Sequence, residues 1–417
     1  MTENQVDYLV AGASHAALSA LEAIRMHDAA GSIAVLAKEA HPPYSPTVLP
    51  YVVSGRSAPD KVALRPADYF AQQKIAFLNG RALQRIDAAA KRVYFADGGA
   101  MQYGKLLLAT GAAPIIPPIP GLKDVKFHVL RTLDDATALK AALPKTKAAV
   151  VLGAGLIGMH AAENLAKTGA RVTIVEMQPQ VLPGYFDAAA AQIIASVFVE
   201  KGVQLLLGSK VEKLSPAAQG CTLTLADGSR IEADLLLVAT GVAPTMDYLQ
   251  GSGVDTERGI LVDAHMRTSA ADIYAAGDVA QARGFYSGKA LVGGILPDAV
   301  EQGRIAGMAM AGDPAVSDYP GSVPLNTYAF FGQQALSVGS QSDGEVVLQE
   351  ADAAKRQYLK IVMQDDRLTG IFGINRPFDA GIMWQLILRR TDLAAVREKF
   401  IAQPQQMARQ LMSRLWR

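Results

Sequence analysis

Three glycines in the middle of the chain have the spacing that a dinucleotide phosphate requires. Gly153, Gly155 and Gly158 form a G-x-G-x-x-G pattern between an apolar stretch, residues 150–152, and a segment with helical periodicity. The first glycine permits a tight turn, the second lets the backbone approach a pyrophosphate, and the third lets the helix pack closely on the strand. These residues predict a dinucleotide site.

An acidic residue and two backbone groups complete this predicted site. Residues 171–175 have the pattern of the next strand, and Glu176 follows it, where a carboxylate can bind both ribose hydroxyls. This favours NAD over NADP, because a 2'-phosphate would bring a charge of about −2 and residues 177–179 contain no arginine to bind it. The N–H groups of Leu156 and Ile157 lie where the helix N-terminus would hold the pyrophosphate. The alternative is a tight turn without a nucleotide.

A second, less regular turn lies near the N-terminus. A strand is expected over residues 6–11 and a helix over residues 17–26, with Gly12, Ser14 and Ala17 at the glycine positions between them. Ser14 and Ala17 narrow the approach to a phosphate, although both are small and the Ser14 hydroxyl can donate a hydrogen bond. The turn alone leaves a dinucleotide site and an ordinary strand-to-helix turn both open.

Residues around this turn supply further candidate contacts to a nucleotide. Ala16 lies at the start of the helix, and His15 could cap the helix, contact a phosphate or be a surface histidine with no role. The residue that aligns with Glu176 is Ala37, and the nearest carboxylate is that of Glu39.

An internal repeat links the two turns. Residues 106–114, LLLATGAAP, and residues 236–244, LLVATGVAP, agree at seven of nine positions, and an Asp-Gly hairpin turn precedes each. We infer two copies of one unit, each running from a glycine turn to an A-T-G segment, where a short threonine and a glycine let a strand end pass beside a nucleotide. The candidate residues in the two A-T-G segments are Ala109, Thr110 and Gly111, and Thr240 and Gly241.

A third candidate contact follows the second copy. Residues 273–276 have the pattern of a strand that ends at Gly277 and Asp278, where Asp278 could bind a ligand or belong to a plain turn. The next helix is expected over residues 297–310. It begins with Pro297, a favoured residue in the first helical turn, so its N-terminal N–H groups could face the first nucleotide site.

The composition limits the classes of protein to which the chain can belong. It has 417 residues, 50% of them hydrophobic, which suffices for about three domains. A formal net charge of +1 argues against a nucleic-acid-binding protein, and no apolar run reaches the ~18 residues of a membrane span. Residues 1–14 lack the basic region of a signal peptide, so we predict a cytoplasmic protein.

Cysteine content restricts the chemistry further. Cys221 is the only cysteine, which excludes an internal disulfide, an iron–sulfur cluster or a zinc site built from the chain's own thiols, and no metal ligands are predicted. Cys221 lies in an alternating segment, residues 220–223, where a half-buried structural side chain is favoured over a redox centre.

The predicted fold class is α/β. We expect two Rossmann-like dinucleotide-binding domains and a C-terminal α+β domain. The first dinucleotide-binding domain is expected over residues 1–115 and 245–320, the second over residues 116–244 and the C-terminal domain over residues 321–417. Short strands are expected at residues 327–331, 335–338, 357–363 and 368–374. The helical tail that follows carries seven basic residues against two acidic ones, either as a docking surface for an acidic partner or as a solvated helix face.

Three motifs in this order resemble the pyridine nucleotide-disulfide oxidoreductase superfamily. They are G-x-S-x-x-A from Gly12, G-x-G-x-x-G from Gly153 and A-A-G-D at residues 275–278. The resemblance implies that the first domain holds FAD and the second NAD, with Asp278 at the FAD ribityl or pyrophosphate region. It also implies that the C-terminal domain is an interface or dimerisation-like domain. Residues 42–55 and 299–312 resemble the ferredoxin-reductase and nitrite-reductase branch, in which Glu39 fits the position of the ribose-binding acid.

A more specific resemblance concerns the FAD subunits of multi-subunit 2-oxoacid (phenylglyoxylate) and tungsten aldehyde oxidoreductase complexes. The segments that carry it are AGASHAALSALEAIRMHDAAG, LPYVVSGRSAP and TGIFGINRPFDAGIMWQLILRRTDL. The sequence departs from the wider family at His160, where many members have a glutamate beside the nicotinamide, so Glu163 takes that role or none. Residues 44–50 contain no cysteine, whereas disulfide, peroxide and coenzyme A disulfide reductases of the family need one.

These observations predict an FAD-dependent NAD(H) oxidoreductase. A flavin without a thiol relay suits exchange between NAD(H) and one-electron carriers, and the resemblance implies iron–sulfur subunits or a ferredoxin-like protein as partners in a larger complex that reduces NAD. The alternatives are a free-standing ferredoxin or rubredoxin reductase, an NADH oxidase, and a non-catalytic NAD-binding scaffold subunit whose first turn no longer holds FAD.

Overall fold

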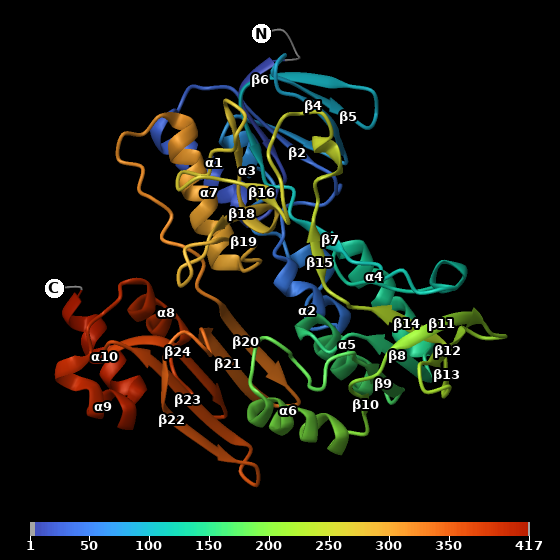
Figure 1. Cartoon of the computed structure of the whole chain (residues 1–417). Coiled ribbons are helices and arrows are strands. Elements are labelled where there is room, and N and C mark those ends of the chain that lie inside the picture. Colours follow the sequence, from blue (N-terminus) through green and yellow to red (C-terminus); the bar gives the residue numbers. More distant parts are fainter. Residues whose placement is uncertain (1–4, 416–417) are drawn as a thin grey trace. The chain divides into compact units, whose positions relative to one another are not determined.

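The computed structural model describes residues 5–415 and divides into two compact units (Figure 1). Unit 1 comprises Met1–Ser45, Asp60–Ala113 and Val242–Ser322. Unit 2 comprises Pro46–Pro59, Pro114–Gly241 and Val323–Arg417. The predicted NAD and C-terminal domains thus fall in one unit, and the boundaries of three separate domains stay a prediction. Each unit contains helices and a sheet with parallel strands, which confirms the predicted α/β class.

Unit 1 is built on a seven-stranded sheet with the order β3-β2-β1-β6-β5-β4, in which β17 also pairs with β6. The neighbours β3-β2, β2-β1, β1-β6 and β6-β17 are parallel, whereas β4, β5 and β6 form an antiparallel meander. The strands are β1 (Gln5–Ala11), β2 (Ile33–Ala37), β3 (Ile75–Asn79), β4 (Leu83–Asp87), β5 (Arg92–Phe95), β6 (Ala100–Leu108) and β17 (Ile273–Ala275). All five residues of β2 are buried, as expected of a parallel strand covered on both faces.

Smaller elements complete unit 1. Strand β16 pairs with β18 and β18 with β19, and the A-T-G segments lead into β7 and β15, which pair with each other. The strands are β7 (Ala112–Pro114), β15 (Val242–Pro244), β16 (Ile260–Leu261), β18 (Ala280–Arg283) and β19 (Ala290–Leu291). The helices are α1 (His15–His27), α3 (Tyr69–Gln72) and α7 (Leu296–Ala311).

Helices α1 and α7 lie side by side with very little space between them (Figure 1). A Cβ atom at Gly303 would lie 2.2 Å from the carbonyl oxygen of Ala16, and one at Gly307 would lie 2.4 Å from that of Ala20. Two glycines four residues apart therefore let the backbones of the helices approach. This contact places the first two turns of α1 beside the middle of α7.

A buried carboxyl group lies in the first turn of α7. Asp298 is 4% exposed, and its Oδ2 accepts a hydrogen bond of 2.5 Å from the hydroxyl of Ser322. Burial, with a smaller contribution from the charge of Asp278, raises the pKa of Asp298 to about 6, although the hydrogen bond from Ser322 opposes this rise.

Unit 2 contains a four-stranded parallel sheet with the order β10-β9-β8-β14 and a separate antiparallel meander, β11-β12-β13. The strands are β8 (Ala148–Leu152), β9 (Arg171–Val175), β10 (Gln204–Leu206), β14 (Leu235–Val238), β11 (Val211–Pro216), β12 (Cys221–Leu225) and β13 (Arg230–Ala233). The helices of this part are α2 (Leu49–Val53), α4 (Leu133–Ala142), α5 (Leu156–Lys167) and α6 (Ala188–Glu200). Both predicted Asp-Gly hairpins are confirmed, since β5-β6 and β12-β13 are antiparallel pairs.

The C-terminal part of unit 2 is a five-stranded antiparallel sheet with the order β20-β21-β24-β23-β22. Its strands are β20 (Leu325–Phe330), β21 (Gln333–Gly339), β22 (Glu345–Asp352), β23 (Gln357–Gln364) and β24 (Arg367–Ile374), followed by α8 (Ala380–Leu388), α9 (Arg397–Ala402) and α10 (Pro404–Leu415). Strand β22 was not predicted, because it is an edge strand with mostly exposed side chains and no alternating pattern. In the tail, Arg397 forms an ion pair with Asp366, and Arg417 lies outside the described residues.

No helix within residues 5–415 combines the length and the apolar character needed to cross a membrane.

The packing of α1 on α7 leads to a prediction. Gly307→Ala should destabilise the protein by about 1 to 3 kcal/mol, because overpacking against the Ala20 carbonyl outweighs the helix propensity that alanine gains, about 1 kcal/mol. Urea unfolding measures the change. Gly381→Ala in α8 is the control, since the nearest atom to a Cβ there is 3.4 Å away and a small stabilisation is expected. A Gly307→Ala protein as stable as the unmutated one would contradict this account.

The buried Asp298 gives a pH-dependent prediction. The folded pKa is about 6 and the unfolded pKa about 3.9, so the stabilisation by the protonated carboxyl is complete below pH of about 4 and is lost as pH rises through about 6. Relative to Asp298→Asn, the unmutated protein should lose on the order of 2 kcal/mol of stability across this window.

Unfolding free energies of both proteins from pH of about 4 to about 7 test this prediction. Asp60→Asn provides a control at an exposed carboxylate, whose side chain is 73% exposed. If the unfolding free energies of the unmutated and the Asp298→Asn proteins changed in parallel with pH, the pKa of Asp298 would not be raised by burial and the prediction would be wrong.

Candidate functional site

The second glycine turn connects β8 to α5 in unit 2. Gly153 has φ +102°, and a Cβ atom there would lie 2.5 Å from the carbonyl oxygen of Ala239. At Gly158 a Cβ atom would lie 2.1 Å from the Gly153 carbonyl oxygen, so both positions require glycine for packing. Gly155 differs, because its Cβ position is open space. This opening lies at the N-terminus of α5, beside Leu156 and Ile157, and fits a ligand that approaches the backbone.

Glu176 lies at this turn, as predicted. It directly follows β9, and its Oε2 accepts a hydrogen bond of 2.7 Å from the backbone N–H of Ala154, between the first two glycines. Its Oε1 accepts a second bond of 2.8 Å from the N–H of Gln178. The carboxylate is therefore oriented by the backbone and keeps lone pairs for ribose hydroxyls.

The second A-T-G segment passes against the same turn. Ala239 donates its N–H to the Leu152 carbonyl at 2.8 Å, and Gly241 has φ +110°. The Thr240 hydroxyl donates to the Ile115 carbonyl at 2.8 Å. The Thr240 side chain therefore holds the segment around Ile115, a role that the sequence does not indicate.

The first turn repeats part of this geometry in unit 1. Gly12 has φ +122°, and a Cβ atom there would lie 2.0 Å from the carbonyl oxygen of Ala109. Ser14 is the N-cap residue of α1, but its hydroxyl donates to the Tyr44 carbonyl at 3.3 Å instead of capping the helix. The N-terminal N–H groups of α1 thus have no side-chain cap.

His15 and Ala16 begin α1 at this turn. The His15 Nε2 atom is buried and has no hydrogen-bond partner among the described residues. Burial and the charge of Arg65 lower the pKa of His15, while the nearby Asp278 opposes this effect. An unsatisfied buried ring nitrogen at an uncapped helix N-terminus fits the phosphate of a dinucleotide such as FAD.

Tyr44 connects two of the predicted residues of the first site. Its hydroxyl donates to Glu39 Oε2 at 2.7 Å, and its carbonyl accepts from Ser14. This role could not be predicted, because it depends on how residues 40–44 fold back after β2. Tyr44 itself is 8% exposed.

The first A-T-G segment lies beside Gly12 but uses its threonine internally. The Thr110 hydroxyl lies 2.7 Å from the hydroxyl of Tyr248 and 3.2 Å from the Thr245 carbonyl oxygen. Gly111 follows with φ +69°. As in the second copy, the threonine side chain is used for hydrogen bonds within the protein. The backbone of the segment lies beside the glycine turn.

Gly277 and Asp278 lie near the N-terminal ends of α1 and α7. Gly277 has φ +80°, and its N–H donates to Gln302 Oε1 at 2.9 Å. A Cβ atom at Gly277 would lie 3.2 Å from the Ala16 Cβ and 3.6 Å from that of Ala299. Asp278 therefore follows a turn enclosed by both helices, and Pro297 lies in the first turn of α7.

His160 and Glu163 project from α5 toward β20 of the C-terminal sheet. The His160 ring lies edge-on to Tyr328 with centroids 4.7 Å apart, and burial lowers the pKa of His160 so that the neutral form is favoured. Glu163 Oε1 accepts from the Phe331 N–H at 2.9 Å and lies 2.5 Å from Lys167 Nζ. Glu163 is thus held by two partners, a packing role that its sequence position did not reveal.

Cys221 lies on β12 of the meander, a strand that belongs to neither glycine turn. It is 1% exposed and packs in a core cluster with Leu214 and Leu223. Burial raises the pKa of its thiol, which disfavours the reactive thiolate. The predicted position in a hairpin strand is confirmed, but the side chain is fully buried instead of half-buried, because it faces the core cluster of the meander.

Comparison with known proteins agrees with this geometry. The family model for pyridine nucleotide-disulphide oxidoreductases matches residues 6–306. The NADH-dependent phenylglyoxylate dehydrogenase subunit epsilon of Aromatoleum evansii is 57% identical over 98% of both chains. Rhodocoxin reductase of Rhodococcus erythropolis is 29% identical over 89% of this chain and 87% of its own length.

A solved structure extends the similarity to the fold. The ferredoxin reductase for the CYP199A2 system from Rhodopseudomonas palustris superimposes with a TM-score of 0.81 at 27% identity, covering 89% of this chain and 91% of that chain. The chain belongs to the pyridine nucleotide-disulphide oxidoreductase family and is an FAD-dependent NADH oxidoreductase.

Proposed function

We propose that this chain exchanges electrons between NAD(H) and one-electron iron–sulfur carriers. The observation that carries the proposal is the coexistence of two dinucleotide turns with a single, buried cysteine. Members of such a family that reduce disulfides or peroxides need a reactive thiol, and Cys221 is buried on a strand outside both turns. Bound FAD would accept a hydride from NADH as two electrons and release the electrons singly.

The FAD site is proposed at the convergence of α1, α7 and Gly277 in unit 1. In this proposal the N–H groups at the start of α1 bind the pyrophosphate, Glu39 binds a ribose and Asp278 binds the ribityl or pyrophosphate region. The proposed contacts are Gly12, Ser14, His15, Ala16, Glu39, Ala109, Thr110, Gly111, Gly277, Asp278 and Pro297. The neutral His15 can donate a hydrogen bond to a phosphate without adding charge.

The NAD site is proposed at the β8–α5 turn in unit 2, with Glu176 as the ribose-binding acid. The proposed contacts are Gly153, Gly155, Leu156, Ile157, Gly158, Glu176, Thr240 and Gly241. His160 and Glu163 are proposed only as residues near the nicotinamide. Hydride transfer depends mainly on holding the two rings about 3 to 3.5 Å apart, so this chain's contribution is position more than acid or base catalysis.

Membership of a multi-subunit 2-oxoacid or aldehyde oxidoreductase complex is a further part of the proposal. Its support is the 57% identity to a subunit of a phenylglyoxylate dehydrogenase. In that setting another subunit would oxidise the substrate, iron–sulfur subunits would carry the electrons, and this chain would reduce NAD. A free-standing ferredoxin reductase is the second candidate, supported by the likeness to rhodocoxin reductase. The cytoplasmic location stays a prediction.

The choice of NAD over NADP can be tested at Glu176. Glu176→Ala should weaken NADH binding by about 1.5 to 3 kcal/mol, because a charged hydrogen-bonding group is lost, and should narrow the preference over NADPH. Reduction of the bound flavin by each nucleotide, followed by absorbance, measures both effects. Glu176→Gln is the matched control and should retain more NADH affinity, because one acceptor oxygen remains. Equal use of NADH and NADPH by the unmutated protein would disprove the assignment.

The transfer of electrons without a thiol is tested at Cys221. Under anaerobic conditions NADH should bleach the bound flavin, and one-electron dyes should then be reduced at the same rate by the unmutated and the Cys221→Ser proteins. Disulfides and peroxides should be poor acceptors for both, because neither has an accessible thiolate. Loss of dye reduction in Cys221→Ser, with normal flavin content and folding, would require a thiol intermediate and reject the proposal.

A further inference from the structure

The segment that connects β9 to α6 is hydrogen-bonded to the glycine turn of unit 2. It begins with Glu176, whose carboxylate accepts a hydrogen bond from the N–H of Ala154, and Leu182 further along the segment also binds Ala154. The Leu182 N–H donates to the Ala154 carbonyl at 2.8 Å. Both backbone polar groups of Ala154, the residue between Gly153 and Gly155, are therefore bound by this one segment, residues 176–187.

Leu182 holds its position in the segment by burial. Its side chain is fully buried, and its backbone adopts φ +49°, a left-handed conformation that costs a leucine free energy. Such a conformation persists only where the surroundings impose it. Contacts made by the residues before and after Leu182 must therefore hold its backbone in this conformation.

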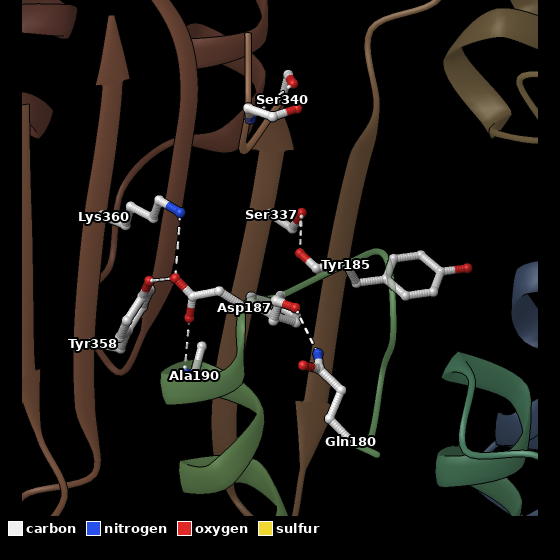
Figure 2. Close-up of polar contacts among 10 residues, drawn as sticks. Gln180, Tyr185, Asp187, Ala190, Ser337, Ser340, Tyr358 and Lys360 are labelled. Atoms are coloured by element: carbon white, nitrogen blue, oxygen red, sulfur yellow. Dashed lines mark hydrogen bonds and ion pairs between the residues drawn. The ribbon is translucent and has the colours of Figure 1, made fainter. Parts of the chain in front are cut away.

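The far end of the segment is fixed by the C-terminal sheet (Figure 2). The Ser337 hydroxyl donates to the Tyr185 carbonyl at 3.1 Å. The Tyr358 hydroxyl donates to Asp187 Oδ2 at 2.5 Å, and Lys360 Nζ lies 3.3 Å from the same oxygen. We refer to Ser337, Tyr358 and Lys360 as the anchoring cluster.

The register of the sheet places two members of the anchoring cluster on one face. Ser337 of β21 and Lys360 of β23 both lie opposite Phe372 of the intervening strand β24. Residues directly opposite one another in neighbouring strands point to the same face. This face meets the segment that carries Tyr185 and Asp187, as Figure 2 shows.

Asp187 receives enough partners to stay ionised despite its burial. Burial raises its pKa, but the hydrogen bonds from Tyr358 and the Ala190 N–H and the charge of Lys360 outweigh burial and lower the pKa overall. The bond to Ala190 also caps the N-terminus of α6. Lys360 is itself only 7% exposed, so this ion pair is largely screened from water.

We propose that the anchoring cluster consists of positioning residues for NAD(H), which act through Tyr185, Asp187 and Leu182 on the glycine turn. This inference rests on the NAD site proposed above. The cluster fixes one end of residues 176–187, the segment fixes Ala154 and Glu176, and these groups shape the turn that binds the dinucleotide. A site ordered before the ligand arrives binds more tightly, since less conformational entropy is lost on binding.

Substitutions in the C-terminal sheet test this proposal in the FAD-loaded protein. Tyr358→Phe removes one hydroxyl, Ser337→Ala removes another, and Lys360→Met removes the charge but keeps most of the side-chain stem. Each should raise the Kd for NAD+ and the KM for NADH about three- to tenfold, the effect of losing one hydrogen bond or charge interaction. The kcat at saturating NADH, the KM for a one-electron dye and the FAD content should stay unchanged.

Lys355→Met is the matched control. Lys355 lies in the turn between β22 and β23, where it pairs with Asp352 at 3.2 Å and its side chain is 72% exposed. It should leave the Kd for NAD+ unchanged. Isothermal titration calorimetry gives this Kd without turnover, and thermal unfolding reports any general loss of stability.

The results separate positioning from a merely structural role. A lower unfolding temperature with an unchanged Kd for NAD+ in Tyr358→Phe and Ser337→Ala would overturn the proposal, as would equal effects of Lys360→Met and Lys355→Met. Because Tyr358→Phe and Ser337→Ala each remove only one oxygen atom, they decide the outcome even if Lys360→Met fails to fold. If Glu176→Ala also leaves NADH binding unchanged, the NAD site itself is misplaced; if Glu176→Ala weakens binding and the cluster variants do not, only the anchoring role is wrong.

Discussion

Both dinucleotide turns depend on the same close backbone approach. The alanine that opens each A-T-G segment directs its carbonyl oxygen at the first glycine of the corresponding turn, where a Cβ atom would be 2.0 Å from Ala109 and 2.5 Å from Ala239. No other residue type fits at Gly12 or Gly153 without moving a strand end. In each copy of the internal repeat, the first glycine of the turn and the alanine of the A-T-G segment therefore form the same close contact.

The two copies differ in how their helices use the remaining space. In the second copy Gly158 lies against the carbonyl of Gly153, so the helix is pressed onto its own turn. In the first copy Ala17 takes the corresponding position, and the helix of this copy, α1, is instead approached closely by the glycines of α7. The first motif therefore departs from the glycine pattern without losing the strand–turn–helix arrangement.

The sequence predicts those features that depend on neighbours along the chain. The β8–α5 turn, the position of Glu176 after β9, the two hairpins and the place of Cys221 in a hairpin strand follow from local periodicity and turn residues. The hydrogen bonds of Tyr44, Glu163 and Asp187 could not be predicted. Glu163 and Asp187 are bound by residues 168 and 171 positions away, and no pattern in a single sequence identifies such pairs. Strand β22 was missed because an exposed edge strand carries no apolar alternation.

The course of the chain between the units has an evolutionary consequence. Each unit is assembled from three separate segments, and the short segment Pro46–Pro59 belongs to unit 2 although the residues on either side of it belong to unit 1. Its attachment is specific, since Asn164 of α5 donates to the Pro50 carbonyl at 3.0 Å. Neither unit can be exchanged between genes as one continuous piece of coding sequence. Exchange of a whole unit would require three separate stretches of coding sequence, whereas the residues proposed to bind NAD all lie within one of them, Pro114–Gly241.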